Sequence, residues 1–373
     1  MANTIKIVLS GYYGFDNIGD EAVLYSIITA LRNEIENVEL IVLSNNPDKT
    51  KALYNVKSVN RWKLSEVAKV IKESDLLVSG GGSLLQDVTS SKTIPYYLAI
   101  VKIAQFYKKK VVFYSQGIGP VNKGINRSLI KHVVNKVNEI FVRDAGSKAL
   151  LEEIGIKKAV YLAIDPVLGI SIAPQDIKKR EKTVGIYIRP WQDEQHDRNM
   201  IDSMASGLVE LIDKGYDLCF IPMHYDQDKE IAITLAKEVK ETAINKNIAT
   251  KEQLVSRIEV VDKSLSIKEV LAYTASFDFI VGMRLHSLIM AAACHVPMLG
   301  ISYDPKVTSF IEEMKVPYCI NSNALTSENF KGSLLQLEAE KEEQKEALIK
   351  CLEEKKERIY LPAKRIKELL ENK

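Results

Sequence analysis

The sequence predicts two doubly wound α/β domains in tandem. Short runs rich in Val and Ile alternate with amphipathic helical patterns along most of the 373 residues. The alternation starts again near residue 183, after a polar segment (171–182) that contains Pro174. Strands that alternate with helices in this way are typical of parallel sheets covered on both faces. A chain of this length also suggests two domains of ordinary size.

The expected boundaries follow from this alternation. We predict a first domain over residues 1–172, a second domain over 182–325, and a C-terminal helical tail over 326–373. Two Rossmann-like domains in tandem would face each other across a cleft. Clefts between domains are common ligand sites, so we expect the active site there.

The first domain is predicted from short apolar runs that read as buried strands: Ile5–Leu9, Val38–Leu43, Leu76–Ser79, Val111–Ser115, Ile140–Val142 and Ala159–Leu162. Between the first two runs, Glu21 to Arg32 has apolar residues at helical spacing. The second domain is predicted from a similar series: Val184–Ile188, Asp217–Ile221, Ile258–Val261, Phe277–Val281 and Met298–Ile301.

The tail has a different composition. From Gln336 to Arg358, Glu and Lys dominate and Leu and Ile recur at helical spacing, and a second helix is expected from Ala363 to Leu370. We interpret the tail as an amphipathic helix that packs one face on the body of the protein. A membrane-surface helix is the alternative, which the mixture of acidic and basic residues disfavours.

Composition and charge exclude several classes of protein. Apolar residues make up 46% of the chain and charged residues 27%, so each domain can bury a core. A net charge of +2 is too small for recognition of nucleic acid by bulk charge. The four cysteines show neither metal-ligand spacing nor a disulfide framework, which favours a reduced, cytoplasmic protein. A strand follows the N-terminus at once, and no apolar run could span a bilayer, so we expect neither a signal peptide nor a membrane span.

Three glycine-rich segments follow predicted strands of the first domain. The segment from Ser10 to Glu21 contains Gly11, Gly14 and Gly19, with acidic residues that would repel a bare phosphate. Its alternative interpretation is a helix cap with Asp20 in the first turn. The segment Val78–Asp87 contains three consecutive glycines, and Ser115–Pro120 is the third. Because carboxyl ends of parallel strands meet at one edge of a sheet, we predict a ligand-binding site there, formed by Gly11, Tyr12, Gly14, Asp16, Asn17, Gly80, Gly81, Gly82, Gln86, Asp87 and Gln116.

The most informative segment lies in the second domain, from Val281 to Cys294. An apolar run ends at Gly282, Arg284 and His286 follow, and a helical pattern then begins. A helix start with an Arg and a His favours an anionic ligand and allows proton transfer near neutral pH. Arg189 and Lys306 also follow predicted strands of this domain, and Arg143 follows one of the first domain. His224 is either a further site residue or a structural one, and a salt bridge with Asp144 is the alternative role of Arg143.

Six of these motifs, in this order, resemble those of polysaccharide pyruvyltransferases, close to the CsaB type of bacterial cell-wall enzymes. They are Gly11–Glu21, Gly80–Asp87, Gln116–Pro120, Val142–Asp144, Arg189–Trp191 and Gly282–His286, and the tail carries no such signature. The resemblance implies a fold like that of GT-B glycosyltransferases. It also implies transfer of pyruvate from phosphoenolpyruvate to a sugar as a 4,6-ketal, with release of phosphate.

The acceptor that the resemblance implies is a β-N-acetylmannosamine of a lipid-diphosphate-linked disaccharide. We expect this acceptor to bind the glycine-rich ligand site predicted in the first domain. The product would enter secondary cell-wall polysaccharide, to which S-layer proteins attach. A lipid-linked acceptor would bring the protein to the inner, cytoplasmic face of the membrane. The family's donor-site residues carry over to Arg143, Arg189, Arg284, His286 and Lys306, with His286 and Arg284 as the catalytic residues. No metal, cofactor or nucleic acid is expected.

Two alternatives stay open at this point. A nucleotide-sugar glycosyltransferase or epimerase could use the same fold, because fold alone does not fix function. A non-catalytic anion-binding protein is the second alternative. The density of polar groups at the predicted strand ends favours an enzyme over it.

Overall fold

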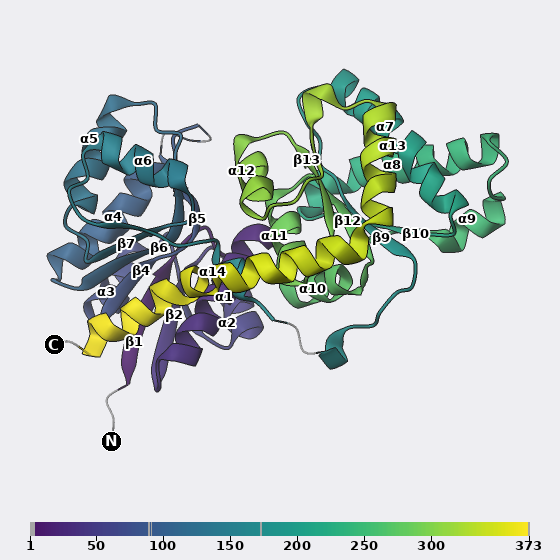
Figure 1. The fold of residues 1–373 in the computed structure, drawn as a ribbon. Coiled ribbons are helices and arrows are strands. Elements are labelled where there is room, and N and C mark those ends of the chain that lie inside the picture. Colours follow the sequence, from purple (N-terminus) through teal and green to yellow (C-terminus); the bar gives the residue numbers. More distant parts are fainter. Residues whose placement is uncertain (1–3, 89, 91, 172–173, 372–373) are drawn as a thin grey trace. The chain divides into compact units, whose positions relative to one another are not determined.

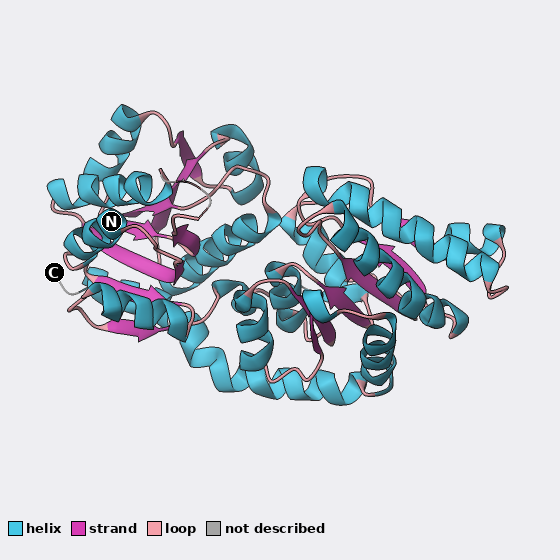
Figure 2. Ribbon diagram, turned by 90° about the horizontal axis from the view of Figure 1, so that it is seen from above, coloured by secondary structure: helices cyan, strands magenta, loops and turns pink. Residues whose placement is uncertain are grey.

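The computed structural model describes residues 4–88, 90, 92–171 and 174–371. The chain divides into two compact units (Figures 1 and 2). Unit 1 comprises residues 1–169 and 355–373, and unit 2 comprises residues 170–354. Each unit holds a parallel sheet whose successive strands are connected mainly by helices, so the predicted α/β fold class is confirmed.

Unit 1 contains an 8-stranded sheet in the order β3-β2-β1-β4-β6-β7-β8, with β5 paired to β6. Its strands are β1 (Ile5–Ser10), β2 (Val38–Ser44), β3 (Lys57–Asn60), β4 (Leu76–Ser79), β5 (Gly82–Leu85), β6 (Lys110–Ile118), β7 (Glu139–Val142) and β8 (Val160–Leu162). Its helices are α1 (Ile18–Glu34), α2 (Pro47–Tyr54), α3 (Leu64–Lys72), α4 (Thr93–Phe106), α5 (Gly124–Val134) and α6 (Ala145–Ile154), followed by the short η1 (Pro166–Gly169).

Unit 2 contains a 6-stranded sheet in the order β11-β10-β9-β12-β13-β14. Its strands are β9 (Thr183–Tyr187), β10 (Asp217–Phe220), β11 (Ile258–Val260), β12 (Phe279–Gly282), β13 (Met298–Ser302) and β14 (Cys319–Asn321). Its helices are α7 (Glu194–Asp213), α8 (Tyr225–Asn245), α9 (Lys251–Arg257), α10 (Ile267–Ser276), α11 (Leu285–Ala293), α12 (Pro305–Glu313) and α13 (Ser327–Ala339), with η2 (Pro174–Asp176) and η3 (Ser322–Ala324).

The tail differs from the prediction. The expected helices 336–358 and 363–370 are wrong in their bounds, because α13 ends at Ala339 and one helix, α14 (Lys341–Glu371), continues through Pro362. Proline removes one helical hydrogen bond and normally interrupts a helix. Here Ile359, Ala363 and Ile366 are buried on both sides of Pro362, so side-chain packing compensates for the lost bond.

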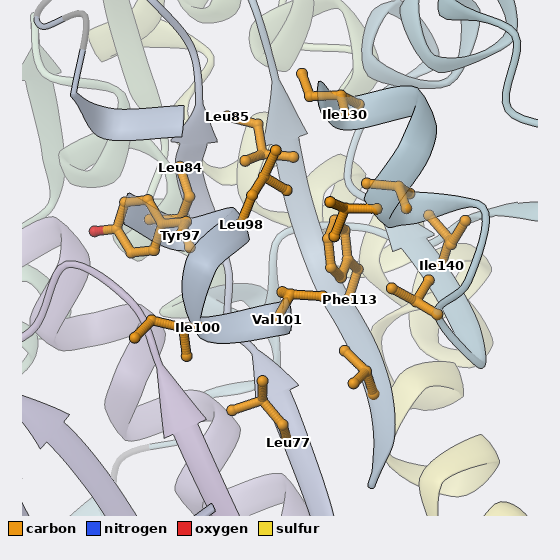
Figure 3. Packing of buried hydrophobic residues seen from close by; sticks show 14 of the residues in the cluster. Leu77, Leu84, Leu85, Tyr97, Leu98, Ile100, Val101, Phe113, Ile130 and Ile140 are labelled. Atoms are coloured by element: carbon orange, nitrogen blue, oxygen red, sulfur yellow. The ribbon is translucent and has the colours of Figure 1, made fainter. Parts of the chain in front are cut away.

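Apolar side chains from the sheet and from helices α3 to α6 form one core cluster of unit 1 (Figure 3). Leu98 and Val101 of α4 lie beside Leu77 of β4 and Phe113 of β6, and all four are at most 3% exposed. Each Å² of apolar surface that this packing removes from water stabilises the unit by roughly 25 cal/mol. The loops that follow β4 and β6 are therefore attached to strands that are fixed by tight packing.

The strand order of each sheet identifies where a ligand would bind. In unit 1 the chain moves outward from β1 to β3 and then returns to place β4 on the other side of β1. In unit 2 the corresponding neighbours are β9 and β12. In open parallel sheets, ligands bind beyond the carboxyl ends of the strands at this point of reversal. The segments after β1, β4, β9 and β12 include most of the motifs identified from the sequence.

Tyr13 closes the core of unit 1 beneath the loops that follow β1 and β4. Its ring is fully buried. A Cβ atom on Gly11 would lie 2.2 Å from Cζ of Tyr13, and one on Gly80 would lie 2.0 Å from its Oη. Both distances are far below contact distance, so these two glycines leave the space that the tyrosine ring occupies.

We predict that Gly80→Ala destabilises the protein by about 1–3 kcal/mol, because the fully packed Tyr13 ring has no room to move away from the added methyl group. Denaturant unfolding measures this change. Gly124→Ala is the matched control in the same unit, because no atom lies within 4 Å of the Cβ it would add. Equal stability of the two variants would contradict the packing role of Gly80.

Candidate functional site

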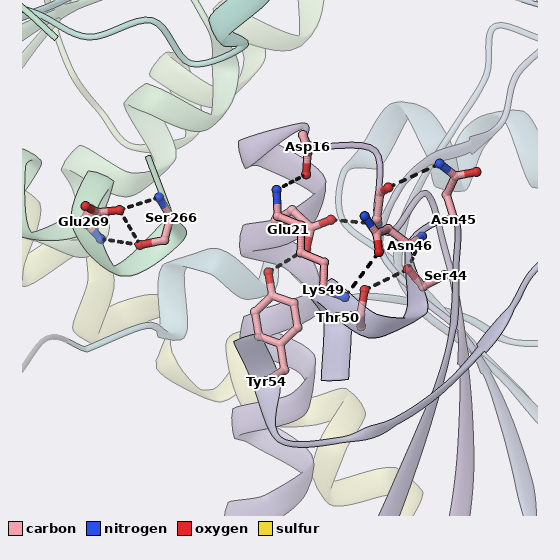
Figure 4. Close-up of polar contacts among 11 residues, drawn as sticks. Asp16, Glu21, Ser44, Asn45, Asn46, Lys49, Thr50, Tyr54, Ser266 and Glu269 are labelled. Atoms are coloured by element: carbon pink, nitrogen blue, oxygen red, sulfur yellow. Dashed lines mark hydrogen bonds and ion pairs between the residues drawn. The ribbon is translucent and has the colours of Figure 1, made fainter. Parts of the chain in front are cut away.

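The loop between β1 and α1 is held in place by side chains from α1 and from the β2–α2 region (Figure 4). The backbone N–H of Gly14 donates to Glu21 at 2.8 Å, and the Tyr54 hydroxyl donates to the second oxygen of Glu21 at 2.5 Å. Nζ of Lys49 contacts Asp16 at 2.7 Å. The loop is therefore positioned before any ligand binds.

Aromatic side chains gather around Arg61 beside this loop. Tyr12 is 41% exposed, and its ring stacks on Phe15 with centroids 4.1 Å apart. The Arg61 guanidinium lies 5.2 Å from the Phe15 centroid and 4.6 Å from that of Tyr96. Nη1 of Arg61 donates to the carbonyl oxygen of Gly11 at 2.7 Å. A fixed, partly exposed aromatic surface of this kind suits the apolar face of a sugar ring.

Several predicted acceptor-site residues have structural contacts of their own. Asn17 caps α1 by accepting a hydrogen bond from the N–H of Gly19, and Gln86 accepts one from the N–H of Val88. The Asp87 carboxylate accepts hydrogen bonds from the N–H groups of residues 122 and 123 and from the Asn126 amide, which lower its pKa. A Cβ on Gly81 would lie 2.8 Å from Val23. Binding of the acceptor by these residues stays a prediction.

A buried polar group extends from β4 to β8. Arg143 is 7% exposed, and its Nη1 contacts Asp165 at 2.9 Å while its Nη2 donates to Ser83 at 3.2 Å. The predicted alternative partner, Asp144, lies 3.8 Å from Nε. Gln116 is fully buried and donates to Ser79 Oγ at 2.6 Å. Arg143 belongs to unit 1, whereas the other predicted donor residues belong to unit 2.

Asp20 lies in the first turn of α1, beside the glycine-rich loop after β4. Gly82 has a φ of +88°, and a Cβ there would lie 3.0 Å from Oδ1 of Asp20. Burial, reinforced by the charge of Glu21, raises the pKa of Asp20 to about 7. Carboxyl groups with such raised pKa values occur preferentially at functional sites.

In unit 2, Arg284 is held by Asp228. Nε of Arg284 donates to Oδ2 of Asp228 at 2.9 Å, and Nη2 donates to Oδ1 at 2.5 Å. Asp228 is fully buried, and its Oδ2 also accepts the backbone N–H of His224 at 2.8 Å. Since β10 and β12 flank β9, this ion pair links the loops on the two sides of β9. The pair fixes Arg284 at the start of α11.

Other cations follow the neighbouring strands β9 and β13. Arg189 donates to the Tyr303 hydroxyl at 3.1 Å and lies 4.8 Å from the centroid of that ring. Trp191 also packs against Tyr303, and the centroids of the two rings are 4.8 Å apart. Lys306 lies in the first turn of α12, which Asp304 caps. The strand order β9-β12-β13 therefore brings Arg189, Arg284 and Lys306 to the same edge of one sheet.

The two histidines considered from the sequence occupy helix starts. His286 is the second residue of α11, a helix without a side-chain cap, and is half-buried. His224 immediately precedes α8, and its buried Nδ1 has no hydrogen-bond partner in the part of the chain that the structure describes. The first N–H groups of a helix attract negative charge, so the position of His286 beside Arg284 suits an anion that also exchanges a proton.

Within residues 4–171 and 174–371, apart from positions 89 and 91, no cluster of His, Cys, Asp and Glu has the arrangement of a metal site. In the same part of the chain, no helix combines the length and the apolar character needed to cross a bilayer.

Some residues at the candidate edges of the two sheets were not identified from the sequence. They are Phe15, Asp20 and Arg61 in unit 1, and Asp228 and Tyr303 in unit 2. Tyr303 follows the predicted strand β13, so its position could have indicated it. Arg61 follows β3, a strand that the sequence did not predict. Asp20 and Asp228 lie in the first turns of helices, where an acidic residue is common for reasons of helix stability alone. Only their burial and their contacts distinguish these two residues from acidic residues that merely stabilise a helix.

Comparison with known proteins supports the resemblance. Residues 17–305 match the model of the polysaccharide pyruvyl transferase family. The amylovoran biosynthesis protein AmsJ of Erwinia amylovora is 21% identical over 84% of this chain and 87% of its own length. Solved structures with a similar fold include a putative UDP-N-acetylglucosamine 2-epimerase from Listeria monocytogenes (TM-score 0.61, 14% identity, 93% of this chain and 91% of that one). A glycosyltransferase from Rickettsia africae is another (TM-score 0.60, 12% identity, 99% of both chains).

The Asp228–Arg284 pair allows a direct test of how this edge is held together. We predict that Asp228→Ala lowers the free energy of unfolding by about 3–5 kcal/mol, because it leaves a partly buried guanidinium without its counter-ion. Asp226→Ala, an exposed position in the same helix turn, should cost less than about 1 kcal/mol. Urea unfolding of both variants provides the comparison, and a small loss at Asp228 would show that the pair does not hold Arg284.

Proposed function

This chain belongs to the polysaccharide pyruvyl transferase family, and we propose that it transfers pyruvate from phosphoenolpyruvate to a saccharide as a cyclic ketal, releasing phosphate. The proposed acceptor is the β-N-acetylmannosamine of a lipid-diphosphate-linked disaccharide, modified at its 4- and 6-hydroxyl groups. The reaction would take place at the cytoplasmic face of the membrane, in the synthesis of secondary cell-wall polysaccharide.

The observation that supports this donor best is the set of cations at the β9-β12-β13 edge of unit 2. Phosphoenolpyruvate carries a carboxylate and a phosphate on adjacent atoms, so it needs several positive charges within a small space. Arg189, Arg284 and Lys306 supply them, with Arg suited to the planar carboxylate and Lys to phosphate. Nη1 of Arg284 takes part in no hydrogen bond among the described residues, so it is left for the donor.

Unit 1 suits the acceptor. Its β1/β4 edge combines glycine-rich loops with the stacked rings of Tyr12 and Phe15, which a sugar ring can contact. Polar side chains there, Asp16 among them, can hydrogen-bond hydroxyl groups. We assign Arg143 to the support of this edge through Ser83 and Asp165, with a donor contact as its second role.

Ketal formation requires a proton at the enol carbon and the loss of protons from two hydroxyl groups. In our proposal His286 supplies the proton to C3 of the donor, which makes C2 electrophilic. Arg284 and Lys306 stabilise the carboxylate and the departing phosphate. Positioned acid–base groups typically accelerate a reaction by about 10²–10⁴-fold.

A nucleotide-sugar reaction is the alternative that the fold favours, because the similar solved structures are an epimerase and a glycosyltransferase. One experiment separates the two. The protein is incubated with the disaccharide acceptor and either phosphoenolpyruvate or a UDP-sugar, and released phosphate and UDP are measured. We expect acceptor-dependent phosphate release only with phosphoenolpyruvate. UDP release or epimerisation, without pyruvyl transfer, would replace the proposal by the alternative.

For the donor site, we predict that Lys306→Ala weakens phosphoenolpyruvate binding by about 10–100-fold, the usual effect of losing a charge-assisted contact of roughly 1.5–3 kcal/mol. Titration calorimetry measures the affinity directly. Lys237→Ala removes the same charge from an exposed position on α8 and should leave the affinity unchanged. Equal losses in both variants would indicate a general charge effect and would remove Lys306 from the site.

For proton transfer, we predict that His286→Ala lowers turnover by about 10²–10⁴-fold while phosphoenolpyruvate still binds. Steady-state kinetics at saturating donor, together with calorimetry, provides the test. His196→Ala, an exposed histidine of unit 2, is the control. If the His286 variant loses donor affinity but turns over within about threefold of wild type, the histidine positions phosphate and does not move a proton.

A further inference from the structure

We propose that Asp20 is the catalytic base of the acceptor half of the site. In this proposal its carboxylate contacts a hydroxyl group of the acceptor sugar and removes the proton as that oxygen bonds to C2 of the pyruvyl group. The inference rests on the proposed function. It assigns the removal of a hydroxyl proton to a residue of unit 1, whereas His286 of unit 2 serves the donor.

The position of Asp20 is the first support. It lies in the first turn of α1, directly after the β1 loop, and faces Gly82 in the segment after β4. Strands β1 and β4 are neighbours at the point where the sheet reverses direction, which is where open parallel sheets bind ligands. At Gly82, a left-handed φ and the 3.0 Å approach of Oδ1 both disfavour any side chain, so no side chain at this position separates the carboxylate from the glycine-rich segment.

The second support is that neither the side-chain cap of α1 nor the contacts that hold the β1 loop use the Asp20 carboxylate. Asn17 caps α1, and Glu21 is bound to Gly14 and Tyr54. Among the described residues, no hydrogen bond or ion pair uses the Asp20 carboxylate, although the residue is half-buried. Half-buried carboxylates are normally hydrogen-bonded or paired, because desolvation of an unpaired charge is costly. An unsatisfied carboxylate at a ligand edge therefore indicates a partner that arrives with the substrate.

The charges around Asp20 shift its pKa in both directions. Arg143 and Arg61 favour its ionised form, whereas Glu21 and Asp165 oppose it. Arg143 is already paired with Asp165, which reduces its effect on Asp20. Burial is then the largest influence and brings the pKa to about 7, the value at which a base both accepts and releases a proton readily. Burial is the largest cause that raises the pKa values of Tyr12, Tyr13 and Tyr97, and the charge of Asp20 adds to it.

A third observation comes from the floor of the same edge. The hydroxyl group of Tyr13 is fully buried beneath Gly11 and Gly80 and has no hydrogen-bond partner among the described residues. Buried polar groups in folded proteins almost always have one. This hydroxyl group and the Asp20 carboxylate are thus two polar groups of one segment, from the end of β1 to the first turn of α1, that take part in no hydrogen bond among the described residues.

The reaction balances with this assignment. The enol CH₂ group gains one proton and becomes CH₃, and the two acceptor oxygens form two bonds to C2. The C2–O bond to phosphate breaks, and the electron pair leaves with phosphate. The two hydroxyl groups lose two protons, of which one replaces the proton given to carbon and the other leaves on hydrogen phosphate. Asp20 accepts a proton from the first attacking hydroxyl group and returns it through solvent to His286, which gave its own proton to carbon. Asp20 therefore ends each cycle as the carboxylate.

The test uses Asp20→Asn in the full-length protein, with Asp48→Asn as the control. Asp48 is an exposed residue of unit 1 in the first turn of α2. We expect Asp20→Asn to lower turnover by about 10²–10⁴-fold. Donor affinity should stay unchanged. The rise of wild-type turnover as pH increases through about 7 should be absent from this variant, because the ionised carboxylate is the active form. Asp20→Glu should recover part of the rate together with that rise.

Stability provides a readout that does not depend on activity. The ordinary pKa of an unfolded Asp is about 3.9. The folded protein therefore binds more protons than the unfolded chain between about pH 4 and 7, and Asp20 lowers stability as pH increases through this range. Asp20→Asn should then be more stable than wild type at pH 8 and similar to it at pH 4. This result would also show that the variant folds.

The outcomes separate the two proposals. If wild type forms the ketal and Asp20→Asn turns over within about threefold of it, or keeps the same pH dependence, the base assignment is overturned and the proposed function stands. If wild type transfers no pyruvate from phosphoenolpyruvate to any saccharide, the proposed function fails and the base assignment fails with it. Loss of turnover in Asp20→Asn with intact donor binding supports both.

Discussion

Parallel strand pairing is the constraint on which the candidate ligand edge of each unit depends. Every pairing in the described parts of the two sheets is parallel, so all strands of a sheet end at the same edge. Residues distant in sequence meet there, such as Asp20 and Gly82 in unit 1 or Asp228 and Arg284 in unit 2. The order of the strands then selects the segments after β1 and β4, and after β9 and β12, as the centres of the two edges.

The two edges differ in chemistry in a way that suits two different substrates. Unit 2 presents Arg189, Arg284 and Lys306, of which Arg284 is fixed by a buried carboxylate. Such a set favours a small anion with more than one charge. Unit 1 presents exposed rings and a carboxyl group whose pKa lies near neutrality. That combination favours a neutral ligand with hydroxyl groups, whose protons can be removed.

Much of this organisation could be predicted from the sequence, because it depends on local patterns. Apolar runs located most strands, and the residues that follow them, Arg189, Arg284 and Lys306, were identified on that basis. The strand β3 was not predicted, since Lys57–Asn60 contains a single apolar residue, Val59. Asp87 and Gln116 were predicted as ligand-binding residues from their neighbours in sequence. Their hydrogen bonds to Asn126 and Ser79 depend on tertiary contacts, which no local pattern contains.

The most direct test of the central claim follows the labelled C2 carbon of phosphoenolpyruvate. The protein is incubated with [2-¹³C]phosphoenolpyruvate and the disaccharide acceptor, and the product is analysed by carbon–proton correlation NMR. Our account predicts one labelled quaternary ketal carbon that correlates with the methyl group and with protons at two positions of the same sugar. A labelled carbon bound to a single sugar oxygen, or label that remains in phosphoenolpyruvate or free pyruvate, would contradict it.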